Sequence, residues 1–143
     1  WMPLVRAALY GLGEDLHIAV WPGSDHNTKD ITRFIARESR SYFVSVGALM
    51  HKKNFPAETP HLERILDKAP DILANGGSCI AGPDGEWLIS PVIDKEGIFY
   101  QDLDFSRIME ERQNFDPAGH YSRPDVTRLI LNLERQSTLE IPQ

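Results

Sequence analysis

Short apolar runs alternate with a helical pattern near the start of the chain, and this alternation restricts the fold more than any other feature. The runs at residues 16–20 and 42–48 each have the length of a buried strand. Between them, Ile31, Phe34 and Ile35 recur at helical spacing after a loop that contains proline and glycine. The order strand, helix, strand predicts an α/β or α+β fold with a sheet covered on both faces.

The opening segment has the pattern of a helix. Pro3 suits a first turn, where its missing N–H costs nothing, and apolar residues from Leu4 to Leu9 fall on one stripe. Gly11 can end this helix. The segment has no basic stretch and no small-residue cleavage site, so it is not a signal peptide. Because a helix rarely begins without a capping residue, we expect an N-terminal part of the protein to precede Trp1.

The pattern predicts further elements, separated by turn residues. Asn27 or Thr28 is expected to cap the helix after the first strand. A further helix is expected to start at Thr59, with Leu62, Ile65 and Leu66 facing inward. The remaining expected elements are strands at 78–81 and 86–90 around a turn at 82–85, a strand at 97–103, a helix at 105–112 and a last strand at 126–133.

Length and charge exclude several classes of protein. The 143 residues fit one domain, and 41% hydrophobic with 25% charged residues are typical of a globular chain. Fifteen Lys and Arg against 21 Asp and Glu give a net charge of −6, which argues against a nucleic-acid or anionic-membrane partner. A single cysteine favours a reducing compartment, and we expect the cytoplasm.

Cys79 is the residue whose type and setting could supply a nucleophile. It follows Gly76 and Gly77, and the backbone N–H groups of such a pair can lower a thiol pKa. The alternative is a small buried side chain on a core strand, since apolar Ile80 and Ala81 follow. The glycines do not form a phosphate loop, because the Lys-Ser or Lys-Thr that should follow them is missing.

The histidines do not predict a metal site. His17, His26, His51, His61 and His120 show no paired zinc spacing. His17 lies in an apolar run and is interpreted as a satisfied core or interface histidine.

The segment 116–125 combines two prolines, a glycine and charged residues ahead of the last expected strand. One interpretation is a structural brace in which Arg123 pairs with Asp116 or Asp125 while Tyr121 packs. The other is direct contact with a substrate.

Four segments, in family order, resemble nitrilases of the carbon–nitrogen hydrolase superfamily. They are Met-Pro-Leu-Val-Arg-Ala-Ala-Leu-Tyr at 2–10, Val-Trp-Pro-Gly at 20–23, the glycine-rich pieces 76–79 and 82–86, and the segment 116–125. The first is similar to the helix after the family's nucleophilic cysteine, and the last to the C-terminal segment of the nitrilase branch. The resemblance extends from Trp1 to about Asn132, so the chain is identified as the C-terminal half of a nitrilase.

The resemblance implies the second half of an αββα sandwich. Residues 1–104 would form the C-terminal part of the hydrolase domain, and residues 105–143 a C-terminal extension. A second subunit often extends this sandwich, so the resemblance implies a homo-oligomer. Sheet faces and strand edges would be exposed wherever the other half is missing.

The resemblance also implies a chemistry without metal or cofactor. In the family, a cysteine attacks a small nitrile to give a thioimidate and then a thioester, with a glutamate as base and a lysine that stabilises charge. The nucleophile would lie a few residues before Trp1, so we expect no catalytic residue in this chain; Cys79 matches a hairpin cysteine of the family. Trp1 and Met2, next to the nucleophile, and Trp21 and Pro22, as an apolar wall, are the expected substrate-binding residues.

Three other functions stay open. Cyanide hydratases and dihydratases share the fold and the triad. A truncated chain could serve as a non-catalytic subunit of an intact nitrilase. The third is an independent thiol enzyme built on Cys79.

Trp21 also has an alternative interpretation, in which its side chain only packs in the core.

Overall fold

The computed structural model describes residues 2–134 and residue 137. The elements along the chain are α1 (Pro3–Gly11), β1 (Leu16–Trp21), α2 (Asp25–Ser39), β2 (Tyr42–Gly47), β3 (Leu49–His51), the 3₁₀ turn η1 (Lys52–Asn54), α3 (Leu62–Leu66), β4 (Ile72–Ala81), β5 (Trp87–Ile93) and α4 (Ser106–Asn114).

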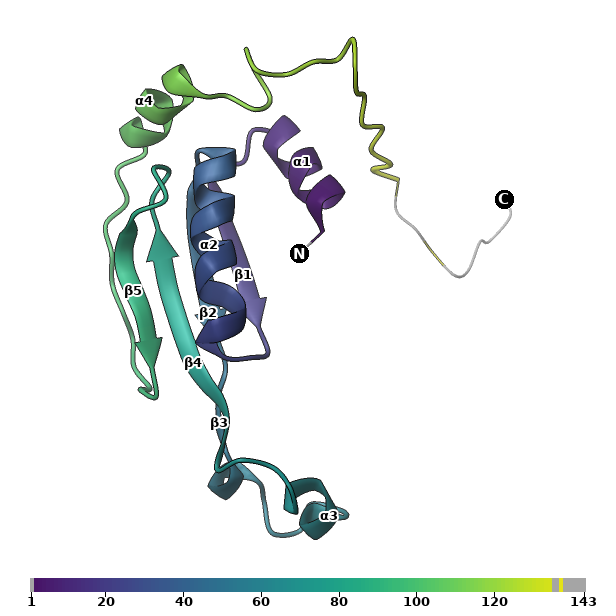
Figure 1. Ribbon diagram of the computed structural model, residues 1–143, viewed down its shortest axis with the longest axis vertical. Coiled ribbons are helices and arrows are strands. Elements are labelled where there is room, and N and C mark those ends of the chain that lie inside the picture. The colour runs from purple at the N-terminus through teal and green to yellow at the C-terminus, as the bar shows by residue number, and fades with distance from the viewer. Residues whose placement is uncertain (1, 135–136, 138–143) are drawn as a thin grey trace.

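The strands form one mixed sheet, in the order β1-β2-β4-β3 with β5 also paired to β4. β1 and β2 are parallel, and the other pairs are antiparallel. α2 connects the two parallel strands and lies across one face of the sheet (Figure 1). The predicted strand-helix-strand unit is therefore confirmed, and the mixed sheet with its helices makes the fold α+β.

The core lies between α2 and the sheet. Ile35 and Ala36 of α2 pack against Phe43 of β2 and Ala81 of β4, and all four side chains are buried. Burial of such side chains stabilises the fold by about 1.5–3 kcal/mol each for the larger ones. Ser24 occupies the N-cap position of α2, three to four residues before the expected cap at Asn27 or Thr28.

The opposite face of the sheet is open in the described part of the chain. Alternation along β1 directs Ile18 and Val20 to this face, where they are 64% and 78% exposed. Val46 of the neighbouring strand joins them. The expectation that both faces are covered is wrong for the described residues, whereas the expectation of an exposed sheet face is confirmed. An all-apolar run fits a strand between two layers, and here only one layer is present.

Two expected strands are not strands. Residues 97–103 run back beside β5 without a ladder (Figure 1), and Ile98 and Tyr100 are 80% and 84% exposed. Residues 126–133 are also irregular, with Ile130 87% exposed. Both segments have strand-like composition, but a strand needs a neighbouring edge, and no paired neighbour is present for them in the described residues.

The region between β3 and β4 forms an arm that projects away from the sheet (Figure 1). It carries α3, which is shorter than expected and buries no residue. The expected inward stripe of Leu62, Ile65 and Leu66 is therefore wrong, and Ile65 is 48% exposed. Pro60 and Pro70 restrict the helix on both sides, and no sheet face lies close enough to bury its apolar residues.

α4 joins the end of the chain to the body, close to the helix predicted at 105–112. Ile108 is 2% exposed. Arg107 pairs with Asp84 in the hairpin turn, and Arg112 Nη1 lies 2.9 Å from Asp15 Oδ1. These contacts fix α4 at the end of the sheet where β1 begins.

Candidate functional site: the loop between β1 and α2

Trp21 ends β1 and occupies the boundary between core and surface. Its indole N–H donates to Ser45 Oγ across 3.1 Å, and its ring packs against the core beneath α2. Pro22 follows and is exposed. Together with Gly23, Asn27 and Thr28 they line a hollow of about 230 Å³. The structure thus gives Trp21 a packing contact on one side and a concave surface on the other.

Of the other expected substrate-binding residues, Met2 does not line this hollow. Trp1 lies outside the described residues. Met2 is the residue before α1 and is 68% exposed. The structure therefore joins Trp21 with Pro22 but not with Met2.

Asn75 of β4 holds the start of α2 against the sheet. Its Oδ1 accepts a hydrogen bond from Asp25 N at 3.0 Å, and its Nδ2 donates to Asp25 Oδ1 at 2.7 Å. Its backbone N–H donates to Ser24 Oγ at 3.2 Å. We call this set of three hydrogen bonds the Asn75 clasp.

Two glycines allow the clasp to form. Gly76 and Gly77 have φ of 84° and 86°, in the region that glycine occupies freely. A Cβ on Gly77 would lie 2.7 Å from Asp25 Cα, so only glycine allows α2 to approach this closely. The glycines are an irregularity inside β4, at a register shift against β5, rather than the start of a hairpin strand.

Sequence reasoning missed Asn75 as a functional candidate. Asparagine followed by two glycines indicates a turn, which places its side chain in solvent. The signal that could have found it is the position of the pair within an apolar stretch, where glycine often marks a bulge or a close backbone approach.

Cys79 is a core side chain. It is 2% exposed, and its Sγ contacts Thr32 Oγ1 at 4.0 Å. Burial raises the pKa of the thiol, although hydrogen bonding with Thr32 and Ser45 acts in the opposite direction. A buried, protonated thiol is a poor nucleophile, so the interpretation as a small buried residue is confirmed.

His17 is satisfied by its neighbours, as predicted. Its Nδ1 lies 2.9 Å from Glu14 Oε2, and its ring stacks on Phe43 with centroids 4.4 Å apart. Among the described residues, no group of three or more His, Cys, Asp or Glu side chains could hold a metal ion. Within the same part of the chain, no helix is both long and apolar enough to cross a membrane.

The segment 116–125 forms a compact, exposed turn. Arg123 and Asp125 make two hydrogen bonds of 2.8 and 2.7 Å, which raises the pKa of the guanidinium and lowers that of the carboxyl. Tyr121 packs on Phe115 with ring centroids 4.7 Å apart. The predicted pairing of Arg123 with Asp125 and the packing of Tyr121 are confirmed, whereas Asp116 instead accepts hydrogen bonds from two backbone N–H groups of its own turn.

The fold defines a class of protein. The carbon–nitrogen hydrolase of Helicobacter pylori G27 superposes on 91% of this chain with a TM-score of 0.61, at 20% identity, and 47% of that protein is covered. The chain therefore has the fold of a carbon–nitrogen hydrolase. No family model matches the sequence.

Sequence comparison finds relatives that are named nitrilases. An aliphatic nitrilase of Sinorhizobium fredii is 34% identical over 97% of this chain, and Nitrilase 2 of Arabidopsis thaliana is 36% identical over 92%. The chain is therefore similar in sequence to nitrilases, the branch of the carbon–nitrogen hydrolases that the four sequence segments resemble. It spans 44% and 40% of the length of these two relatives, which fits the expected C-terminal half.

Proposed function

We propose that the protein containing this chain hydrolyses an organic nitrile to a carboxylic acid and ammonia. The observation that carries the proposal is similarity to proteins named nitrilases over nearly the whole chain, 97% in one case. In the proposed reaction a cysteine thiolate adds to the nitrile carbon and forms a thioimidate. One water then releases ammonia and leaves a thioester, and a second water releases the acid and restores the thiol.

In this reaction the described residues shape the pocket rather than perform the chemistry. Trp21 and Pro22 would form an apolar wall against the organic group of the nitrile, and the hollow they line supports that role. Trp1 and Met2 would lie beside the nucleophile. Residues 105–143 would act as a C-terminal extension, attached to the domain at residues 1–104 through α4.

The 143-residue chain alone is proposed to be inactive and to belong to a cytoplasmic enzyme. The thiol of Cys79 is buried and its pKa is raised, so it does not offer a replacement nucleophile. A single cysteine is typical of a protein in a reducing compartment.

The test is ammonia release from a panel of aliphatic and aromatic nitriles by the full-length protein. Ammonia and acid in equal amounts support the proposal. An amide as the sole product, or activity on cyanide alone, identifies a hydratase or dihydratase instead. No turnover of any nitrile or cyanide contradicts the proposal and leaves the non-catalytic subunit. Nitrile-dependent ammonia release by the isolated chain contradicts its proposed inactivity, and release that persists in Cys79→Ala rules out both interpretations of that thiol.

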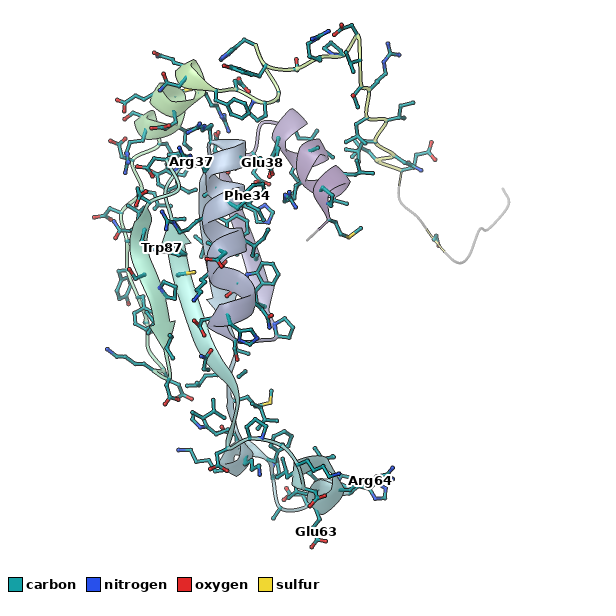
Figure 2. All side chains as sticks on the ribbon, in the orientation of Figure 1. Phe34, Arg37, Glu38, Glu63, Arg64 and Trp87 are labelled. Atoms are coloured by element: carbon teal, nitrogen blue, oxygen red, sulfur yellow. The ribbon has the colours of Figure 1, made fainter. Side chains whose placement is uncertain are left out.

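We further propose a homo-oligomer in which the outer face of α2 meets the same face of a second copy. Phe34 is 53% exposed on this face (Figure 2), with Arg6 above its ring at 5.8 Å. Phe34 also lines two hollows, of about 290 and 250 Å³. An exposed ring beside such hollows is the shape expected at a helix contact, where each ring fills a depression of the other.

The charges on this face are self-complementary. Asp30 and Arg37 both line the second hollow, four residues before and three after Phe34. Neither makes an ion pair with another described residue. An antiparallel second copy related by a two-fold axis near Phe34 would place Asp30 opposite Arg37 twice. A second copy is therefore the partner that this face fits.

A further inference from the structure

The Asn75 clasp replaces a local helix cap with a contact from another strand. Ser24 occupies the N-cap position of α2, but its side chain makes no capping hydrogen bond. Its hydroxyl instead accepts from the backbone N–H of Asn75, while Asn75 Oδ1 accepts from the N–H of Asp25 at the first helical position. One of the unpaired N–H groups at the start of α2 is thus satisfied from β4, which ties the loop before α2 to the sheet.

The amide of Asn75 makes both side-chain contacts because it carries an acceptor and a donor on separate atoms. The oxygen accepts from a backbone N–H, and the nitrogen donates to the carboxylate of Asp25. An aspartate at this position would keep the acceptor but would place two carboxylates at a distance of 2.7 Å. An alanine would lose both contacts.

The clasp fixes one end of the loop that carries Trp21 and Pro22. At the other end, the indole N–H of Trp21 donates to Ser45 Oγ at 3.1 Å, and the Trp21 carbonyl accepts from Ala48 N at 3.2 Å. Between these two ends of the loop lie Pro22 and Gly23, and no hydrogen bond from either of them to another strand is seen among the described residues. The direction of the Pro22 ring therefore depends on where the clasp holds Ser24 and Asp25.

We propose that Asn75 is a positioning residue that sets the Trp21 and Pro22 wall, and through it the size of nitrile that the enzyme accepts. The inference rests on the proposed function, because the wall faces a substrate only if the enzyme acts on nitriles. Asn75 itself need not touch the substrate. A substitution of Asn75 would change the preference among nitriles rather than lower the activity on all of them equally.

The structure offers a reciprocal exchange as the test. In the full-length protein, Asn75→Asp sets two carboxylates against each other, whereas Asn75→Asp with Asp25→Asn exchanges donor and acceptor and restores the hydrogen bond between the two side chains. The single variant is expected to raise KM for a bulky nitrile about tenfold more than KM for a small one, with kcat changed less. The double variant is expected to return both KM values to within about threefold of the starting protein. The control is Asn114→Asp, the same substitution at an exposed position of α4.

Amide hydrogen exchange of residues 23–26 supplies a readout that needs no nitrile activity. Faster exchange in Asn75→Asp, reversed in the double variant, supports the clasp even if the protein turns over no nitrile and the proposed function fails. If exchange follows this pattern but the preference among nitriles stays the same in an active enzyme, the positioning role is overturned while nitrile hydrolysis stands. If the double variant restores neither exchange nor KM, the clasp itself is overturned.

Discussion

Arg40 Nη1 donates a hydrogen bond to Glu111 Oε2 across 2.8 Å, and this ion pair joins the end of α2 to α4. Arg40 ends its helix with φ of 54°, a left-handed conformation that a glycine adopts at lower cost. Its side chain is mostly buried and also lies over the ring of Phe115 at 5.4 Å. The contacts of the guanidinium therefore offset an unfavourable backbone conformation.

Removing the Glu111 carboxylate tests whether the ion pair offsets the backbone strain at Arg40. Glu111→Ala is expected to lower the free energy of unfolding by about 1–2 kcal/mol, because it leaves a mostly buried guanidinium without its partner. Adding Arg40→Gly is expected to recover part of that loss, since it removes both the unpaired charge and the backbone strain. Urea unfolding followed by circular dichroism measures both, with the exposed Glu110→Ala as control. A Glu111→Ala protein of unchanged stability contradicts the account.

The buried thiol predicts slow alkylation and a dependence of stability on pH. Burial raises the pKa of Cys79 above its ordinary value of 9.0, so native thiol stays protonated where unfolded thiol ionises. A raised folded-state pKa contributes stability that is present below pH 9 and is lost as the pH rises through the folded value. Tyr10 and Tyr42, whose pKa values are also raised, act in the same direction.

We therefore expect iodoacetamide at pH 8 to modify Cys79 rapidly in urea and slowly in the native protein. Above pH 9, the fall in melting temperature should be less steep in Cys79→Ala than in the starting protein, while the tyrosines keep the remaining slope. Rapid native labelling would mean that the thiol is accessible and would support the independent thiol enzyme.

The elements that sequence reasoning predicted well are those with local causes. Pro3 and Gly11 mark the ends of α1, and the spacing of Ile31 and Ile35 marks the buried side of α2. The turn at 82–85 is closed by a backbone hydrogen bond from Gly85 N to the carbonyl of Gly82, at 2.8 Å. In each case, short-range backbone preferences or helical periodicity agree with the fold.

The errors concern features that depend on distant parts of the chain. Residues 97–103 and 126–133 have strand-forming side chains, but whether they pair depends on an edge that their own sequence does not specify. The Asn75 clasp joins residues about fifty positions apart, so no local pattern predicts it. For the same reason the sequence predicted Trp21 and Pro22 only through resemblance, and the structure alone shows the hollow that they share.

Charge reversal on α2 tests the proposed homo-oligomer. Arg37→Asp is expected to weaken self-association at least about tenfold, because it sets an aspartate against Asp30 of the second copy in both halves of a symmetric contact. Asp30→Arg should do the same, and the two changes together should restore association. Sedimentation velocity over a range of protein concentration measures the effect. Glu63→Arg on the projecting arm (Figure 2) is the control. A starting protein that is monomeric, or variants that associate equally well, contradicts the proposed surface.

Trp21 has two possible roles, and comparison with Trp87 separates them. Both side chains are partly buried and pack against the same core cluster, but only Trp21 lines the hollow beside Pro22. Trp21→Ala and Trp87→Ala should therefore both lower the melting temperature of the full-length protein, since each removes a large aromatic contact. Only Trp21→Ala should also change the ratio of kcat/KM between a bulky and a small nitrile, by about tenfold, because it alone removes a wall that discriminates between them. Equal losses on every nitrile, in proportion to the lower melting temperature in both variants, would make Trp21 a packing residue only.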